Sequence, residues 1–374
     1  MANAIDYLDW RGDIPFSVSP FNEVDALIVC KLTSLNFTGI IPDGGSMALP
    51  DAAAAYFEKY GDKDVRLGVL LAPGTVTMVK KMLSSLRFDG LTIYDYVNHI
   101  DHERGEQFCA LTASLPDGTY YVAFRGTDDT ITAWKEDFNM SAHDAVPAQL
   151  DAVSYLTRAG WRFDGQIRVG GHSKGGNLSV FAAMNAPSEL QARILDVYNF
   201  DGPGFRDTVR NDDGYRRIRE KIRMFVPQYA LVGVLLVNDS EYEIVESCET
   251  GTSAHNGFTW QVLGTRFVRC RQFALRTRVY RDAIREWAGK LDLQQRQDLI
   301  NALFDALEST GAKTLTDLTE QRVRKAMAAA RDLLSDEEER ALFTESMELL
   351  ARAYIASARK SLPVIRRFQR KKKD

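Results

Sequence analysis

The sequence predicts an α/β fold with a mainly parallel sheet and a helical appendage at the carboxyl end. Segments typical of strands alternate with helical segments from residue 120 to residue 200, a pattern that favours parallel pairing. A strand, a Gly-x-Ser-x-Gly turn and a helix follow one another within residues 166–183. After about residue 275 the sequence pattern becomes that of long amphipathic helices. We therefore expect two parts, an α/β domain over residues 1–275 and a helical region over residues 276–374.

The amino-terminal part is predicted to be helical and to cover one face of the sheet. A short helix is expected at the start, and the apolar run 26–35 alternates too poorly for a strand. Residues 51–105 are also helical in pattern, most clearly at 52–60 and 76–86.

The predicted strands begin with a hairpin. Residues 108–114 and 120–124 flank Asp117-Gly118, a dipeptide that suits a tight turn. A helix at 148–158 leads to the strand and helix of 166–183, and strands are expected at 194–200 and 221–226. A second hairpin is expected around residues 238–240.

Two helices, 293–307 and 336–362, are predicted for the helical region. The basic run 366–373 is interpreted as a solvated chain end.

Composition narrows the class of protein. With 374 residues and 45% hydrophobic content the chain can bury a sizeable core. Its net charge of −4 does not indicate a protein that binds nucleic acid. The amino terminus lacks the features of a signal peptide, and no apolar stretch could span a bilayer, so a cytoplasmic protein without stable membrane insertion is expected. The four cysteines have no metal-binding spacing and are interpreted as reduced core residues. No metal or organic cofactor is indicated, and the oligomeric state stays open.

The Gly-x-Ser-x-Gly turn nominates Ser173 as a nucleophile. A sharp turn between strand and helix holds its central residue in a strained conformation and exposes the hydroxyl to a base. Gly171 and Gly175 lack the Cβ atoms that would keep strand and helix apart, and Gly176 extends this close approach. The new helix also directs free N–H groups toward a developing oxyanion.

An acid and then a histidine base are expected after this serine, in that chain order. Among the five histidines, His255 alone follows Ser173, and it lies in a glycine-bounded loop. His172 lies inside the turn, where its side chain should point elsewhere.

The acid is less constrained by the sequence. Asp201 directly follows the predicted strand 194–200, at the edge of the sheet where such sites gather. Asp239 is the main alternative, and Glu241 or Glu243 could also reach the base.

An oxyanion hole needs two hydrogen-bond donors. One is normally the backbone N–H of the residue after the nucleophile, here Lys174. The second should come from a loop after an earlier strand, and Thr127 offers both a backbone N–H and a hydroxyl group.

Two motifs together resemble the class 3 lipases of the α/β-hydrolase superfamily. They are Tyr121–Thr127 with Trp134–Asp137, and Val169–Gly176, and the similarity covers about residues 105–205. From the start to about residue 265 the chain resembles more closely the Mbeg1-like family, a lipase-related bacterial group. That resemblance rests on residues 7–13, 20–25, 201–205, 226–228, 232–233 and the region before Trp260. It implies an α/β-hydrolase fold, with Ser173 as nucleophile, Thr127 at the oxyanion hole and His255 as base.

The sequence departs from the class 3 lipases at two positions. Pro227 and Gln228 stand where their aspartate is expected, which leaves Asp201 or Asp239 as the acid, or a weaker dyad. Lys174 replaces an apolar residue, and as a cation at the rim of the pocket it would favour a polar or acidic substrate over a triglyceride.

A serine hydrolase that cleaves a small-molecule acyl ester or thioester is therefore expected. The alternative is an inactive hydrolase fold whose helical region binds a partner or lipid.

Overall fold

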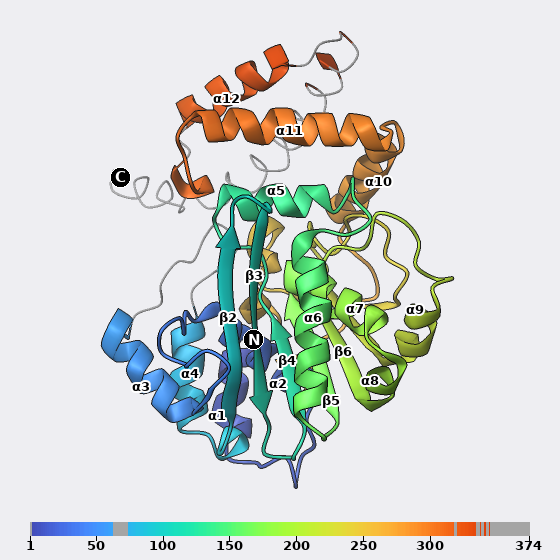
Figure 1. Ribbon diagram of the computed structural model, residues 1–374. Coiled ribbons are helices and arrows are strands. Elements are labelled where there is room, and N and C mark those ends of the chain that lie inside the picture. Colours follow the sequence, from blue (N-terminus) through green and yellow to red (C-terminus); the bar gives the residue numbers. More distant parts are fainter. Residues whose placement is uncertain are drawn as a thin grey trace, which may run out of the picture.

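An eight-stranded sheet forms the centre of the computed structural model, which describes residues 2–62, 74–317 and 320–333 and the single positions 337, 340, 341 and 344 (Figure 1). Its strands follow one another in chain order from β1 to β8. The first four pair antiparallel, and β4 to β8 pair parallel. The strands are β1 (Ser46–Ala48), β2 (Thr92–Asp101), β3 (Glu106–Ser114), β4 (Tyr120–Phe124), β5 (Ile167–His172), β6 (Ile194–Phe200), β7 (Ile222–Pro227) and β8 (Tyr242–Val245).

Helices cover both faces of this sheet. Alternate strand residues point to opposite sides, so in β4 Tyr121 and Ala123 join one core while Val122 and Phe124 join the other. The first face is covered by α1 (Ala4–Arg11), α2 (Glu23–Lys31), α3 (Leu49–Tyr60) and α4 (Thr75–Leu83), and the second by α6 (Pro147–Arg162), α7 (Lys174–Asn185), α8 (Ser188–Arg193) and α9 (Asp213–Ile218). The predicted cover of one face by amino-terminal helices is confirmed.

A further group of helices lies across the end of the sheet (Figure 1). It contains α5 (Ile131–Asn139), α10 (Leu275–Gly289), α11 (Leu293–Ser309) and α12 (Glu320–Leu333). Trp134 and Phe138 of α5 pack against the apolar face of α11, and the rings of Phe138 and Phe304 meet edge to face at 5.4 Å. The helical region is therefore joined to the α/β part through a core of its own.

A buried ion pair holds the amino terminus in place. The Arg87 guanidinium lies 2.5 Å from Asp25, both side chains are fully buried, and Tyr7 donates a hydrogen bond to the same carboxylate. Arg87 also donates to the carbonyl groups of Ile14 and Ser19. The amino-terminal motifs that support the family resemblance therefore have a structural role here.

The prediction that residues 51–105 are helical is wrong for β2. Between Tyr94 and Val97 this strand has a register shift, and Asp95 within it has a φ angle of 51°. Such a bulge breaks the alternation by which a strand is recognised in a sequence. The short β1 and the helix α5 were also not predicted.

The predicted hairpin around residues 238–240 is wrong as well. The chain crosses over after β7 and returns as β8, parallel to it, and the hairpin of this region lies further on. It joins β9 (Val262–Leu263) to β10 (Arg266–Phe267).

All four cysteines are free, but only Cys30 and Cys109 are buried, while Cys270 is half-buried and Cys248 is exposed, so the core assignment is wrong for the last two. The helix expected at 336–362 falls almost entirely outside the described residues, and the basic tail falls wholly outside them.

Candidate active site

Ser173 stands between β5 and α7 in a strained conformation, with φ 60° and ψ −132°. The glycines around it are sterically required: a Cβ on Gly171 would lie 2.1 Å from the carbonyl oxygen of Gly175, and one on Gly175 would lie 2.1 Å from that of Phe124. A Cβ on Gly176 would lie 2.3 Å from the side chain of Asn199. The sharp turn predicted from the sequence is present, and with the parallel strands and the helices on both faces it makes this an α/β-hydrolase fold.

His255 and Asp201 form a buried pair close to this turn. His255 Nδ1 donates to Asp201 Oδ2 at 2.6 Å, and the backbone N–H of Gly233 donates to Asp201 Oδ1 at 3.0 Å. Asp201 is fully buried, and burial raises the pKa of its carboxyl group, against the effect of His255. Both carboxylate oxygens are thus occupied, and one of them fixes the orientation of the imidazole ring.

The other ring nitrogen of His255 is available. Nε2 is buried and has no hydrogen-bond partner among the described residues, and the structure places no hydrogen bond between it and Ser173 Oγ. The neighbouring His172 donates from its Nε2 to the backbone carbonyl of His255 at 2.6 Å, with the two rings 4.5 Å apart. Burial, with help from Lys31, lowers the pKa of His172 well below its usual value, which keeps that ring neutral. His172 therefore braces the loop that carries His255.

The alternative acids are occupied elsewhere. Asp239 accepts hydrogen bonds from the Thr208 hydroxyl, the Val209 N–H and the Arg210 guanidinium at 2.7–2.8 Å. Glu243 is bonded to Arg269. Glu241 is exposed, and Gln228 accepts a hydrogen bond from the Cys270 thiol at 2.9 Å. The structure brings Asp201, and none of these residues, against His255.

The loop after β4 lies directly against the nucleophile. A Cβ on Gly126 would be 2.9 Å from Ser173 Cβ, so the loop approaches the serine through a glycine. The hydroxyl group of the next residue, Thr127, donates to Asp137 Oδ2 on α5. Because the hydroxyl is committed in this way, the remaining donor of Thr127 is its backbone N–H, which has no hydrogen-bond partner among the described residues. The second donor of the expected oxyanion hole, the backbone N–H of Lys174, lies in the first turn of α7, where N–H groups have no partner within the helix.

The side chain of Lys174 is not at a pocket rim, so that prediction is wrong. Only 1% of Lys174 is exposed, and its ammonium group donates to the Gln107 carbonyl and to Glu136, each at 2.8 Å. Asp137 lies 3.9 Å away. The strand and helix that hold Ser173 direct this long side chain inward, beneath the loop that contains Thr127.

Glu136 is the centre of this buried network, and the sequence indicated it only as part of the Trp134–Asp137 motif. Besides Lys174 it accepts from the backbone N–H of Gln107 at 3.1 Å and of Ala148 at 2.9 Å. Burial alone would lower the pKa of Lys174, but Glu136 and Asp137 outweigh it and raise that pKa. For Asp137 burial dominates, and it raises the pKa to about 7 against the effect of Lys174 and Thr127.

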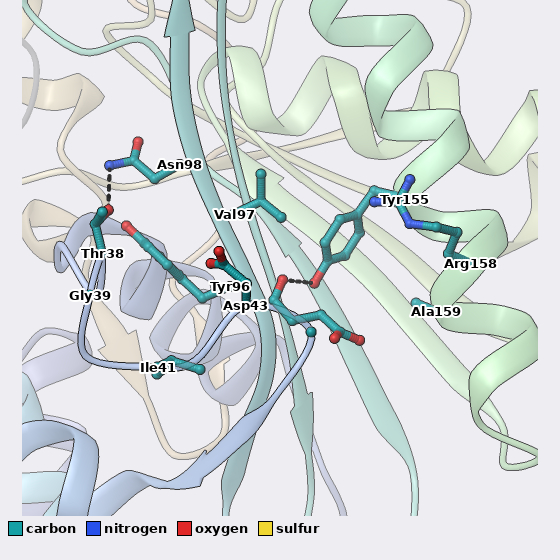
Figure 2. Close-up of a pocket in the computed structure, with 12 residues that line it drawn as sticks. Thr38, Gly39, Ile41, Asp43, Tyr96, Val97, Asn98, Tyr155, Arg158 and Ala159 are labelled. Atoms are coloured by element: carbon teal, nitrogen blue, oxygen red, sulfur yellow. Dashed lines mark hydrogen bonds between the residues drawn. The ribbon is translucent and has the colours of Figure 1, made fainter.

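The site is nearly closed, since Ser173 is 5% exposed and His255 is 2% exposed. A cavity of about 450 Å³ lies away from it, between the loop at residues 38–44, the bulge of β2 and α6 (Figure 2). None of the predicted site residues lines this cavity. Asn98, which lines the cavity, accepts a hydrogen bond from Arg125 at 3.0 Å, and Arg125 directly precedes Gly126.

Comparisons with known proteins find one family model and solved structures that this chain resembles. The family model described as Mbeg1-like matches residues 82–305. Because this span crosses the domain boundary predicted at 275/276, the match does not test that boundary, which stays a prediction. The solved Rhizomucor miehei lipase propeptide complex is 14% identical to this chain. The match covers 64% of this chain and 80% of the lipase chain, with a TM-score of 0.37. The M37 lipase structure is 16% identical, with 67% and 92% covered and a TM-score of 0.34. No curated protein sequence matches the chain. Across the described residues, none of the helices is long and apolar enough to cross a bilayer.

Proposed function

The chain belongs to the Mbeg1-like family, and from the arrangement around Ser173 we propose that it is a serine hydrolase that cleaves an ester or thioester. The observation that carries this proposal is the buried His255–Asp201 pair with an unpartnered Nε2 atom, beside a serine in a strained turn. A buried nitrogen without a partner is costly to a fold, and a reacting hydroxyl group would satisfy it.

Each residue has a defined role in the proposed reaction. Ser173 Oγ attacks the acyl carbon while His255 Nε2 takes its proton, and the imidazole then returns that proton to the leaving group. Asp201 holds the Nδ1–H tautomer and stabilises the imidazolium. The backbone N–H groups of Lys174 and Thr127 receive the oxyanion. Water then attacks the acyl-enzyme with His255 again as base, which releases the acid.

The substrate preference follows from the surroundings of the serine. Because the Lys174 ammonium group is paired within the protein, it supplies no cation for an acidic substrate. With the serine nearly closed off, we expect short acyl chains to react faster than long ones. p-Nitrophenyl esters of two to eight acyl carbons, compared by kcat/KM, would test this order.

The decisive test is labelling of the full chain with a fluorophosphonate, with the adduct located by mass spectrometry. We expect an adduct on Ser173 that is absent in Ser173→Ala. His255→Ala and Asp201→Asn should slow labelling by roughly 10²–10⁴-fold, since a serine without its base or a correctly oriented base is a poor nucleophile. Asp239→Asn is the matched control, because the same change is made at an acid bonded to Arg210, and it should label at the wild-type rate.

The opposite outcome favours the other class of function. A folded wild-type protein without an adduct would contradict the hydrolase proposal. The closed site would then be a structural remnant, and the chain would be an interaction module.

A further inference from the structure

A second cluster of polar side chains lies outside the proposed active site. His99 comes from β2, Glu106 from the start of β3 and Asp151 from α6. His99 Nε2 is 3.6 Å from Glu106 Oε2 and 3.7 Å from Asp151 Oδ2, and one ligand atom from each of the three residues lies within 4.8 Å of the others. Three elements therefore bring an imidazole and two carboxylates to one point.

We propose that His99, Glu106 and Asp151 bind a divalent transition-metal ion, with Zn²⁺ as the best match. Zinc ligands at about 2.0–2.2 Å in a tetrahedron are separated from one another by about 3.3–3.6 Å. The two separations that involve His99 are close to this range before any ion has drawn the ligands together. Three protein ligands leave one position of the tetrahedron for water or a further ligand.

The Glu106 carboxyl group is buried and only partly paired. Its side chain is fully buried, and its Oε1 atom has no hydrogen-bond partner among the described residues. Such a carboxylate is retained in a fold when a cation compensates it. Asp151 adds a second negative charge within the same few ångströms, which makes a doubly charged ion more effective than a single ammonium or guanidinium group.

Arg104 is the cation that now faces the cluster. Its guanidinium lies 2.8 Å from Glu106 Oε2 and 3.5 Å from Asp151 Oδ1. However, its side chain is 47% exposed and belongs to the turn between β2 and β3, so it can leave without disturbing the core. Arg104 and a metal ion would compete for the same oxygens.

The choice of ion follows from the donor atoms. An imidazole nitrogen suits Zn²⁺ and its transition-metal neighbours, whereas Ca²⁺ and Mg²⁺ prefer sites built from oxygen atoms alone. This site could not be predicted from the sequence, because residues 99, 106 and 151 have no recognisable ligand spacing and meet only through the fold.

Zn²⁺ titration of the chelator-treated full chain, by calorimetry and by thermal unfolding, tests the proposal without reference to activity. One ion per chain should bind and raise the Tm. His99→Ala and Asp151→Asn, at two partly exposed positions, should weaken binding at least about tenfold. His143→Ala removes an exposed histidine elsewhere, and Cys248→Ser removes the exposed thiol, so both should bind as the wild type does.

Arg104→Ala separates a metal site from a plain ion-pair network. Removing the competitor should tighten Zn²⁺ binding several-fold and enlarge the rise in Tm. The proposal is wrong if the wild type binds no stoichiometric Zn²⁺, if His99→Ala and Asp151→Asn bind as tightly as the wild type, or if Mg²⁺ binds as well as Zn²⁺.

Discussion

A lysine next to a nucleophilic serine would usually be assigned to the substrate, but Lys174 is directed into the protein. Its ammonium group and the carboxylate of Glu136 are both almost completely buried, at 1% and 0% side-chain exposure. Removing one partner of such a pair leaves an uncompensated charge in a medium of low dielectric constant. The pair therefore fixes the elements that meet beneath Ser173 rather than a ligand above it.

Lys174→Met should lower the free energy of unfolding by about 3–5 kcal/mol, because Glu136 would remain charged and buried. The double variant Lys174→Met/Glu136→Gln should recover part of this loss. Urea unfolding measures both. Lys135→Met is the control: this lysine pairs with Asp305 at the surface, at 3.0 Å, and its loss should cost less than about 1 kcal/mol. Equal losses in Lys174→Met and Lys135→Met would contradict the role given to the buried pair.

The raised pKa of Asp137, about 7, predicts a pH dependence of stability. In the unfolded chain this carboxyl group ionises near pH 4, so between pH 4 and 7 the folded state binds more protons and stability falls as pH rises. Lys174 on α7 and Thr127 after β4 face Asp137 and lower its pKa. The negative charges of Glu136 and Asp128 act in the opposite direction and raise it.

Asp137→Asn should remove this contribution and flatten the fall in unfolding free energy between pH 4 and 7. Asparagine keeps an oxygen that can accept from Thr127, so the loop should hold. Urea unfolding at a series of pH values gives the comparison, and identical profiles for variant and wild type would show that Asp137 does not titrate in this range.

Chain order and sheet topology predicted the base and the acid that accompany Ser173 only in part. His255 followed from elimination, and Asp201 followed from its place after a strand, since parallel strands end at one edge. Asp239 could not be set aside by the same argument, because the sequence placed it at the tip of a predicted hairpin before His255. The hydrogen bonds from Arg210 and Val209 that occupy it depend on loop packing, which residue types alone do not specify.

At the scale of elements, α5 connects the proposed site to the rest of the molecule. Its inner side carries Glu136 and Asp137, and its outer side packs on α11. The chain beside it is also held directly, since Ile131 N–H donates to the Lys313 carbonyl and Leu315 N–H to that of Asp129. The position of α5 thus depends on the helical region.

Leu307→Ala on α11 should lower the free energy of unfolding by about 2–5 kcal/mol, because Leu307 is buried in the core shared with α5. Leu293→Ala makes the same change on the same helix at a position that is 46% exposed, and it should cost less than about 1 kcal/mol. If the two variants were equally stable in urea, α11 would not be packed as described.

Elements with regular patterns were predicted, and those that depend on partners were not. The strands β3 to β7 and helices α6, α7 and α11 carry clear periodicities, and the sequence predicts them at nearly the observed bounds. By contrast, α5 is short and β2 is interrupted by its bulge at Asp95, so tertiary contacts decide their conformation.

For the whole molecule, the predicted division at 275/276 leads to a test. A chain that ends at residue 275 should expose the outer face of α5, bind the dye ANS and lose labelling of Ser173, since α11 and α12 would be absent. Adding Trp134→Gln and Phe138→Gln to the shortened chain should reduce the ANS signal. A shortened chain that labels like the full protein, without ANS binding, would instead establish residues 1–275 as an independent domain.

The packing of α5 on α11 also has a consequence for biosynthesis. Each strand of the main sheet pairs with the one made just before it, so the sheet can assemble as the polypeptide leaves the ribosome. Phe138 cannot pack against Phe304 until that residue has been synthesised, 166 residues later. At translation rates of about 5–20 residues per second, this delay is roughly 10–30 s. During that time the nascent chain presents an uncovered apolar helix face, which is a natural place for a chaperone to bind.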